Sequence, residues 1–371
     1  MFEYDVFIVA FIYSYLILIS FDLPIECMVT EEHYIDNPLP EIDVLKLIVK
    51  HLNWLDYSYL VSKIREANWS KCELCNISFQ KSGASSTPRD LVLGMGYGKS
   101  VRSYITFVRT LRSVNCKASV IILTDNKLYT SFNENERKAL DNCGAILISV
   151  GYLRPYKSCE TITTRHIVMG AFLKFYRALF DRVIVTDLQD TLFQMDPFLD
   201  SFPRTNSYGT YENDMLVSNP INNRWIRETD PKYSYEKYKG KYIMNAGCLY
   251  GSARAMADLY ESYINLSYWF SYPTKTLDQP LLNLMFYDGL LAPSFKRDLK
   301  GEIMISATYW YFKNEMTKDG LFQLSSGGTP RGIHQYNRIC FINAKIQELC
   351  PPLGDWHRDP YGNYEHVLQG C

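Results

Sequence analysis

The feature that most constrains the fold is an alternation of short apolar segments with helix-like segments between residues 91 and 185. The apolar segments are predicted strands and lie at 91–93, 119–123, 145–150 and 183–185. The segments between them carry apolar residues at helical spacing and lie at 100–114, 134–140 and 161–180. Such alternation predicts an α/β fold, in which helices cover both faces of a mainly parallel sheet. Because ligands of such sheets bind at the carboxyl ends of strands, we expect functional residues just after Leu93, Leu123 and Val185.

The regions outside this alternation differ from it in composition. Residues 26–88 are predicted to form a stem or helical accessory segment, because residues 41–66 carry apolar groups at mixed spacings of three and four. The stretch 81–89 (KSGASSTPR) has the composition of a linker. We therefore expect one α/β domain over 89–345 and a cysteine-containing tail over 346–371.

The first 25 residues contain an uncharged apolar stretch, Val6–Phe21. As a helix it would be about 24 Å long, which is short for a bilayer core of about 30 Å. It predicts a signal peptide or a short signal anchor over residues 1–25, although Glu3 and Asp5 stand where a basic region is usual. A buried N-terminal helix is the alternative.

The cysteine content also favours the secretory pathway. The chain has ten cysteines, an even count that suits disulfides in an oxidising lumen. Cys72 and Cys75 form a lone CxxC without a second pair, so their spacing does not favour structural zinc. Glycosylation sequons at Asn68, Asn76 and Asn265 are compatible with lumenal exposure.

The segment 91–100 (LVLGMGYGKS) is close to a phosphate-binding P-loop. That loop needs four residues between its first glycine and the Gly-Lys-Ser, whereas only three separate Gly94 from Gly98. The missing residue matters because the backbone amides of the loop must wrap one phosphate. We favour a glycine-rich βα turn that leaves room for a nucleotide, with a P-loop-like NTPase as the alternative.

The segment 182–198 (RVIVTDLQDTLFQMDPF) places carboxylates at the end of an apolar strand. Asp187 and Asp190 share one turn, and a cation between them would relieve their repulsion. Mg²⁺ and Mn²⁺ prefer such oxygen ligands, although Asp-rich turns also serve as plain turns or helix caps. The segment also resembles the DxDGT loop of haloacid-dehalogenase-type phosphatases, but Gln189 stands at the acid/base position and an amide cannot shuttle a proton.

The same segment more closely resembles the metal-binding DxD region of GT-A glycosyltransferases. Four other segments resemble GT-A motifs in the expected order: 95–108 (MGYGKSVRSYITFV), 242–251 (YIMNAGCLYG), 277–283 (LDQPLLN) and 332–338 (GIHQYNR). In that family they correspond to the nucleotide site, the donor-sugar strand, a helix start at the reaction centre and a metal-binding histidine. The resemblance covers about residues 90 to 340 and implies a GT-A (Rossmann-like) fold.

The resemblance implies roles for individual residues. The metal ligands would be Asp187, Asp190 and His334. Because the chain has DxxD instead of DxD, we expect Asp190 to bind the metal directly and Asp187 to act through water or at the ribose. The residues expected at the nucleotide sugar are Gly96, Tyr97, Arg165, Lys174, Asn245 and Gly247. Asp278 would hold substrate hydroxyls, or act as the base of an inverting enzyme. Core packing, helix capping and a solvated helix face are the structural alternatives.

Together these roles predict a metal-dependent glycosyltransferase of the hexosyltransferase type. Its cofactor would be Mn²⁺ or Mg²⁺, its donor a UDP- or GDP-linked sugar, and its acceptor a glycan or glycoprotein. With the N-terminal segment they predict a type II membrane protein of the Golgi or endoplasmic reticulum lumen, with secretion as the alternative. An inactive transferase-fold protein that binds sugar or acts as a scaffold is the non-enzymatic alternative.

The charge balance bears on the partners. Lys plus Arg number 39 and Asp plus Glu number 40, which gives a net charge of -1. This argues against a nucleic-acid partner, which normally requires a basic excess. A diphosphate ligand remains compatible with this balance if a bound cation, instead of a basic surface, supplies the positive charge.

Overall fold

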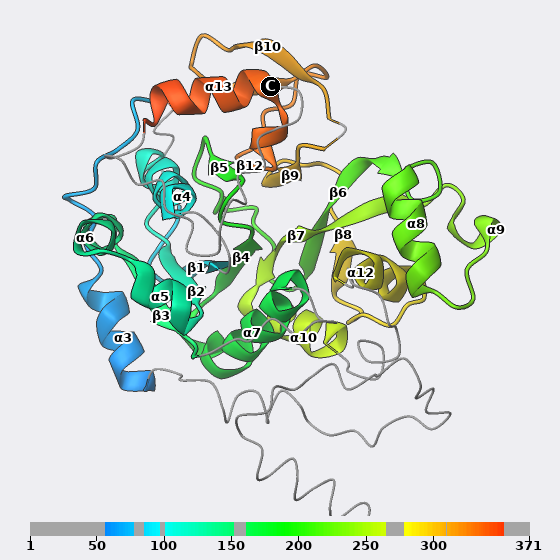
Figure 1. Ribbon diagram of the computed structural model, residues 1–371, viewed down its shortest axis with the longest axis horizontal. Helices are drawn as coiled ribbons and strands as arrows, with labels where there is room; N and C mark the ends of the chain where they lie inside the picture. The colour runs from blue at the N-terminus through cyan, green and yellow to red at the C-terminus, as the bar shows by residue number, and fades with distance from the viewer. Residues whose placement is uncertain are drawn as a thin grey trace, which may run out of the picture.

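A seven-stranded sheet runs through the centre of the protein (Figure 1). The computed structural model describes residues 56–77, 85–96, 101–151, 161–264, 278–308 and 310–351. The strands of the central sheet are β1 (Asp90–Gly96), β2 (Ser119–Thr124), β3 (Ala145–Ser149), β4 (Arg182–Thr186), β6 (Ser207–Met215), β7 (Tyr242–Ser252) and β8 (Phe295–Arg297). Their order is β3-β2-β1-β4-β7-β6-β8. Only β7 runs against the direction of the other strands in this sheet.

Helices cover both faces of this sheet. The helices of the described part of the chain are α3 (Tyr57–Glu66), α4 (Val101–Ser113), α5 (Asn126–Ser131), α6 (Glu134–Asn142), α7 (Thr161–Tyr176), α8 (Pro220–Thr229), α9 (Tyr235–Tyr238), α10 (Ala253–Tyr263), α12 (Asp278–Tyr287) and α13 (Cys340–Leu349), with single 3-10 turns η1 (Arg177–Leu179) and η2 (Tyr336–Arg338). Of these, α13 packs on the smaller sheets described below. Alternate residues of the strands separate the two cores. Leu91 and Leu93 pack with α7, α10 and α12, whereas Val92 packs with α4 and α6. The predicted α/β fold, with its mainly parallel sheet and helices on both faces, is therefore confirmed.

Two smaller sheets lie beside the central one (Figure 1). One has the order β5-β12-β9 and consists of β5 (Thr191–Phe193), β12 (Gly332–His334) and β9 (Met304–Ser306). The other pairs β10 (Phe312–Met316) with β11 (Phe322–Leu324). Their side chains share a third core with α13 and Cys75. The C-terminal part of the chain thus pairs, through β12, with β5, the strand that follows β4.

The predicted elements agree with the structure, with differences at their ends. The strands predicted at 91–93, 119–123, 145–150 and 183–185 are β1, β2, β3 and β4. The helix predicted over 161–180 ends as an α-helix at Tyr176 and continues as η1. At the carboxyl end of the predicted linker, Ser86 is buried and its hydroxyl donates to Asp196 Oδ2 at 2.7 Å, whereas residues 81–84 lie outside the described residues.

Two disulfides hold the segment before the central sheet. Cys72 bonds to Cys143 and Cys75 bonds to Cys350, so the two cysteines of the CxxC have different partners. The apolar stretch Val6–Phe21 and the tail beyond residue 351 lie outside the described residues. Among the helices of the described part, none has the length and apolarity that a membrane span requires.

Candidate functional site

Two aspartates lie on the loop that joins β4 to β5. Asp187 directly follows β4 and Asp190 directly precedes β5. Between them Leu188 is only 2% exposed and packs on β1, where a Cβ added to Gly94 would lie 2.3 Å from Leu188 Cδ2. The apolar side chain thus anchors the loop to the sheet. This anchor explains why a DxxD sequence still brings both carboxylates to one point.

His334 reaches the same point from the C-terminal part of the chain. It ends β12, where it pairs antiparallel with Thr191 of β5 and parallel with Ser306 of β9. The next residue, Gln335, has a φ of 62°, so the chain turns sharply after the histidine. The Gln335 side chain accepts a hydrogen bond from the Ser306 hydroxyl at 2.9 Å, which fixes this turn.

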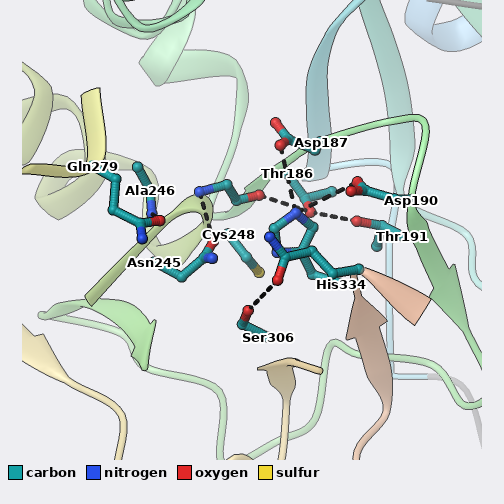
Figure 2. Close-up of polar contacts among 12 residues, drawn as sticks. Thr186, Asp187, Asp190, Thr191, Asn245, Ala246, Cys248, Gln279, Ser306 and His334 are labelled. Carbon is teal, nitrogen blue, oxygen red and sulfur yellow. Dashed lines mark hydrogen bonds and ion pairs between the residues drawn. The ribbon is translucent and has the colours of Figure 1, made fainter. Parts of the chain in front are cut away.

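The two carboxylates and the imidazole form one cluster, in which Asp190 and His334 are buried and Asp187 is half-buried (Figure 2). His334 Nε2 lies 3.4 Å from Asp187 Oδ2 and 3.5 Å from Asp190 Oδ1. One ligand atom from each residue lies within 4.8 Å of the other two. Within the described part of the chain, Asp190 Oδ1 and both His334 ring nitrogens have no hydrogen-bond partner. Buried polar atoms without hydrogen-bond partners are rare in proteins, and a bound cation would satisfy these oxygen and nitrogen donors, so this donor set fits a divalent cation.

The electrostatics of the cluster favour positive charge. Burial lowers the pKa of His334, but Asp190 and Asp187 outweigh it and raise that pKa to about 9. For Asp187 burial has the opposite sign and raises the pKa, yet Arg165 and His334 hold that pKa well below its usual value. Both aspartates lie at nearly the same distance from His334. The two carboxylates are thus equally close to His334, and Asp187 differs from Asp190 in its additional ion pair with Arg165.

Gly247 forms the wall of the cluster on β7. A Cβ added there would lie 2.5 Å from His334 Cε1 and 2.8 Å from Asp187 Oδ2. The Gly247 carbonyl accepts a hydrogen bond from the Asp187 amide at 3.0 Å, and its own amide donates to Asn245 Oδ1 at 2.8 Å. Only glycine leaves room for the histidine and the aspartate at this place.

A second group of charged side chains adjoins the cluster. Arg165 of α7 forms an ion pair with Asp187 and another with Asp278, in which its terminal nitrogen lies 2.9 Å from Oδ2. His166 Nε2 lies 3.6 Å from the same oxygen, and the amide of Gln279 donates to Asp278 Oδ1 at 2.7 Å. Burial raises the pKa of Asp278, but His166 and Arg165 lower it overall. Both oxygens of Asp278 are thus already engaged.

The structure brings Asp187, Asp190, His334, Arg165, Asn245, Gly247 and Asp278 together. Gly96 ends β1, where an added Cβ would lie 2.9 Å from the Tyr104 ring, and Tyr97 lies outside the described residues. Lys174 does not join the cluster. It lies about 13 Å along α7 from Arg165, and its amine forms an ion pair with Glu261 of α10 at 3.6 Å.

No family model matches this chain, and neither does any curated protein. Among solved structures, it is similar to the galactosyltransferase LgtC in complex with donor and acceptor sugar analogues, with a TM-score of 0.43 and 14% identity. That match covers 72% of this chain and 98% of LgtC. An active-site mutant of LgtC gives the same TM-score and identity, with 73% of this chain covered and 99% of the other.

Sequence reasoning missed two residues of the site. Glu212 of β6 accepts a hydrogen bond from Asn245 Nδ2 at 2.9 Å, and Gln279 of α12 donates to Asn222 Oδ1 at 2.8 Å. Gln279 stands in the DQ motif at 278–279, which offered a signal for it. Glu212 stands in a polar stretch (YEND) with nothing in the sequence to show that it faces inward.

Proposed function

We propose that this protein is a metal-dependent glycosyltransferase that transfers a sugar from a nucleotide-diphosphate sugar to a glycan or protein acceptor. The observation that carries the proposal is the convergence of Asp187, Asp190 and His334 at the carboxyl end of β4. These residues come from two distant parts of the chain, and buried polar atoms of Asp190 and His334 have no hydrogen-bond partner among the residues that the structure describes. The resemblance of five ordered segments to GT-A motifs supports the same function.

Asp187, Asp190 and His334 would hold Mn²⁺ or Mg²⁺. When bound, such an ion supplies positive charge to the leaving diphosphate of a nucleotide sugar. The protein contributes the fixed positions of its ligands, because β5 and β9 hold His334 and Leu188 holds the aspartate loop. Arg165 keeps Asp187 ionised through its ion pair, while its second pair fixes Asp278 beside the cluster.

We further propose that the domain works in the lumen of the secretory pathway, tethered by its N-terminal segment. The two disulfides of the described part suit an oxidising compartment. The sequon asparagines Asn68 and Asn76 are exposed, so oligosaccharyltransferase could modify them. Digestion of the cell-expressed protein with an endoglycosidase should increase its gel mobility. A protein that carries no glycan would contradict this location.

The proposed activity is tested with a panel of UDP- and GDP-sugars, scored by thermal shift with and without Mn²⁺. We expect at least one nucleotide sugar to stabilise the wild type only when the metal is present. At a ligand concentration of 100 Kd this stabilisation is about 2.7 kcal/mol. The Asp190→Ala variant should lose it, because a direct ligand is removed. An Asp190→Ala variant with an unchanged metal-dependent shift would overturn the metal assignment.

Two controls complete this experiment. Asp319→Ala removes an exposed carboxylate remote in sequence from the cluster and should keep the full metal-dependent shift. Turnover is then measured by release of the nucleotide from the sugar that binds. Metal-dependent binding without any turnover would identify an inactive transferase-fold protein instead of an enzyme. The P-loop-like alternative predicts that Lys99→Ala abolishes nucleotide binding while His334→Ala does not; Lys99 lies outside the described residues.

A further inference from the structure

Glu212 is a buried carboxylate that does not belong to the cluster of Asp187, Asp190 and His334. It is 3% exposed and lies on β6. Its Oε1 accepts hydrogen bonds from Asn245 Nδ2 at 2.9 Å and from Gln279 Nε2 at 3.3 Å. Its Oε2 has no hydrogen bond within the described part of the chain. Oε2 is not one of the fully enclosed polar atoms that lack a partner. It therefore keeps contact with solvent.

The amides around Glu212 are already engaged. Asn245 Oδ1 accepts from the Gly247 amide at 2.8 Å, and Asn222 Oδ1 accepts from Gln279 Nε2 at 2.8 Å. Gln279 Oε1 accepts from the Ala246 amide at 3.4 Å. Among the acceptor oxygens of these four side chains, Glu212 Oε2 is the one without a partner in the described residues. It is therefore the oxygen that this network leaves for a ligand.

Gln279 donates hydrogen bonds to both Glu212 and Asp278, but these two carboxylates have opposite environments. Both oxygens of Asp278 have partners, and His166 and Arg165 lower its pKa despite its burial. Burial raises the pKa of Glu212, although Asn245, Arg338, Gln279 and His334 oppose this effect. A ligand hydroxyl that donates a hydrogen bond to Glu212 Oε2 would stabilise the charged carboxylate. Asp278 has no comparable acceptor, because both of its oxygens already have partners. The binding role thus suits Glu212.

The position of Glu212 relates it to the candidate metal. Asn245 joins it to Gly247, and a Cβ on Gly247 would lie 2.7 Å from His334 Nε2. In Figure 2, Asn245 and Gln279 lie to the left of His334, while Asp190 lies to its right. The hydrogen bonds from Gly247 to Asn245 and from Asn245 to Glu212 thus form a continuous path from the cluster, where the proposed diphosphate would bind, to Glu212.

We propose that Glu212 Oε2 accepts a hydrogen bond from a hydroxyl of the transferred sugar and thereby selects donors that carry a hydroxyl at that position. This inference rests on the proposed function and adds to it a residue that determines the donor. A hydrogen bond between a hydroxyl and a buried carboxylate is strong because the acceptor is charged. Its loss should weaken binding of the sugar by about 10–100-fold.

The test compares nucleotides with nucleotide sugars by calorimetry in the presence of Mn²⁺. The probes are UDP and GDP on one side, and UDP-glucose, UDP-galactose and GDP-mannose on the other. Glu212→Gln should keep the affinity for the nucleotide within about threefold and lose about 10–100-fold for the nucleotide sugar. The exposed Glu228→Gln on α8 is the matched control and should change neither. Equal losses for both ligands, or no loss, would refute the assignment.

Monodeoxy analogues of the bound donor give a second measurement that needs no variant. One analogue should bind the wild type about 10–100-fold more weakly than the parent donor. The same analogue should bind Glu212→Gln with little further loss, because the lost hydroxyl and the lost carboxylate are partners. If no analogue loses affinity for the wild type, Glu212 does not select a hydroxyl. A wild type that binds no nucleotide and no nucleotide sugar overturns the proposed function and this assignment with it.

Discussion

At the scale of single residues, the candidate site depends on a missing side chain as much as on its charged groups. Gly247 leaves the space into which His334 and Asp187 fit, and its backbone joins the Asp187 loop to Asn245. A methyl group there cannot be accommodated by a small shift. The nearest atoms belong to a ring held by two strands and to a carboxylate held by Arg165.

We therefore expect Gly247→Ala to weaken Mn²⁺-dependent nucleotide binding by about 10–100-fold, the range seen when groups that orient metal ligands are lost. Calorimetry with UDP or GDP and Mn²⁺ measures this. Gly328→Ala is the control, because an added Cβ there would lie 3.4 Å from Leu324 Cδ1, an ordinary contact. Wild-type affinity in Gly247→Ala would show that the cluster tolerates displacement of its histidine.

At the scale of elements, the loop between β4 and β5 shows how an apolar residue positions charged ones. Leu188 fills the space above Gly94, and the Thr186 hydroxyl donates to the Gly247 carbonyl at 3.2 Å below the loop. The loop is thus held by packing on one neighbouring strand and by hydrogen bonds to another. Asp187 and Asp190 need no contact with each other to converge.

Leu188→Ala should destabilise the protein by about 2–5 kcal/mol, because it opens a cavity under the loop, and should also weaken Mn²⁺-dependent nucleotide binding. Gly94→Ala alone should destabilise, since its Cβ would lie 2.3 Å from Leu188 Cδ2. In the Leu188→Ala background the same change should cost less, because that space is vacated. Urea unfolding of the two single variants and the double variant measures the coupling. Additive effects would disprove the proposed anchor, and Leu299→Ala, 62% exposed, is the matched control.

At the scale of the whole molecule, the segment after α3, residues 67–77, is linked by disulfides to the central α/β part and to the C-terminal part of the described chain. Figure 1 shows this blue segment passing along the left side of the molecule toward α13. Cys72 binds it to Cys143 at the end of α6, and Cys75 binds it to Cys350 after α13. The C-terminal part that carries His334 is therefore covalently fixed near the central sheet that carries the aspartates.

Removal of the Cys75–Cys350 bond should lower stability more than removal of the Cys72–Cys143 bond. The bonds span sequence separations of 275 and 71 residues, and loop-closure entropy makes the longer constraint worth about 1 kcal/mol more. Paired Cys→Ser variants, compared by calorimetric unfolding, test this order. Equal losses, or a greater loss for the shorter loop, would contradict it. Metal-dependent nucleotide binding should also be weakened more in the Cys75→Ser/Cys350→Ser variant, because loss of this bond releases the C-terminal segment to which His334 belongs.

The sequence by itself determined the class of fold and most of the residues of the site. Strand and helix periods record which faces of each element are buried, so β1 to β4 and α4, α6 and α7 were predictable from apolar spacing. The residues of the candidate metal cluster were predicted from the resemblance of their segments to GT-A motifs, which keep carboxylates and a histidine at recognisable places in the chain. Nothing in such local patterns depends on distant contacts.

Only the tertiary structure decided which side chains from distant segments come into contact. Lys174 and Arg165 share one helix, yet the direction of α7 brings only Arg165 to the aspartates. Glu212 became part of the site because β6 pairs with β7 and places its carboxylate against Asn245. Asp187 lies as close to His334 as Asp190 does because Leu188 packs on another strand. Each outcome depends on packing between segments far apart in the chain, and the spacing of residues along one segment does not encode such contacts.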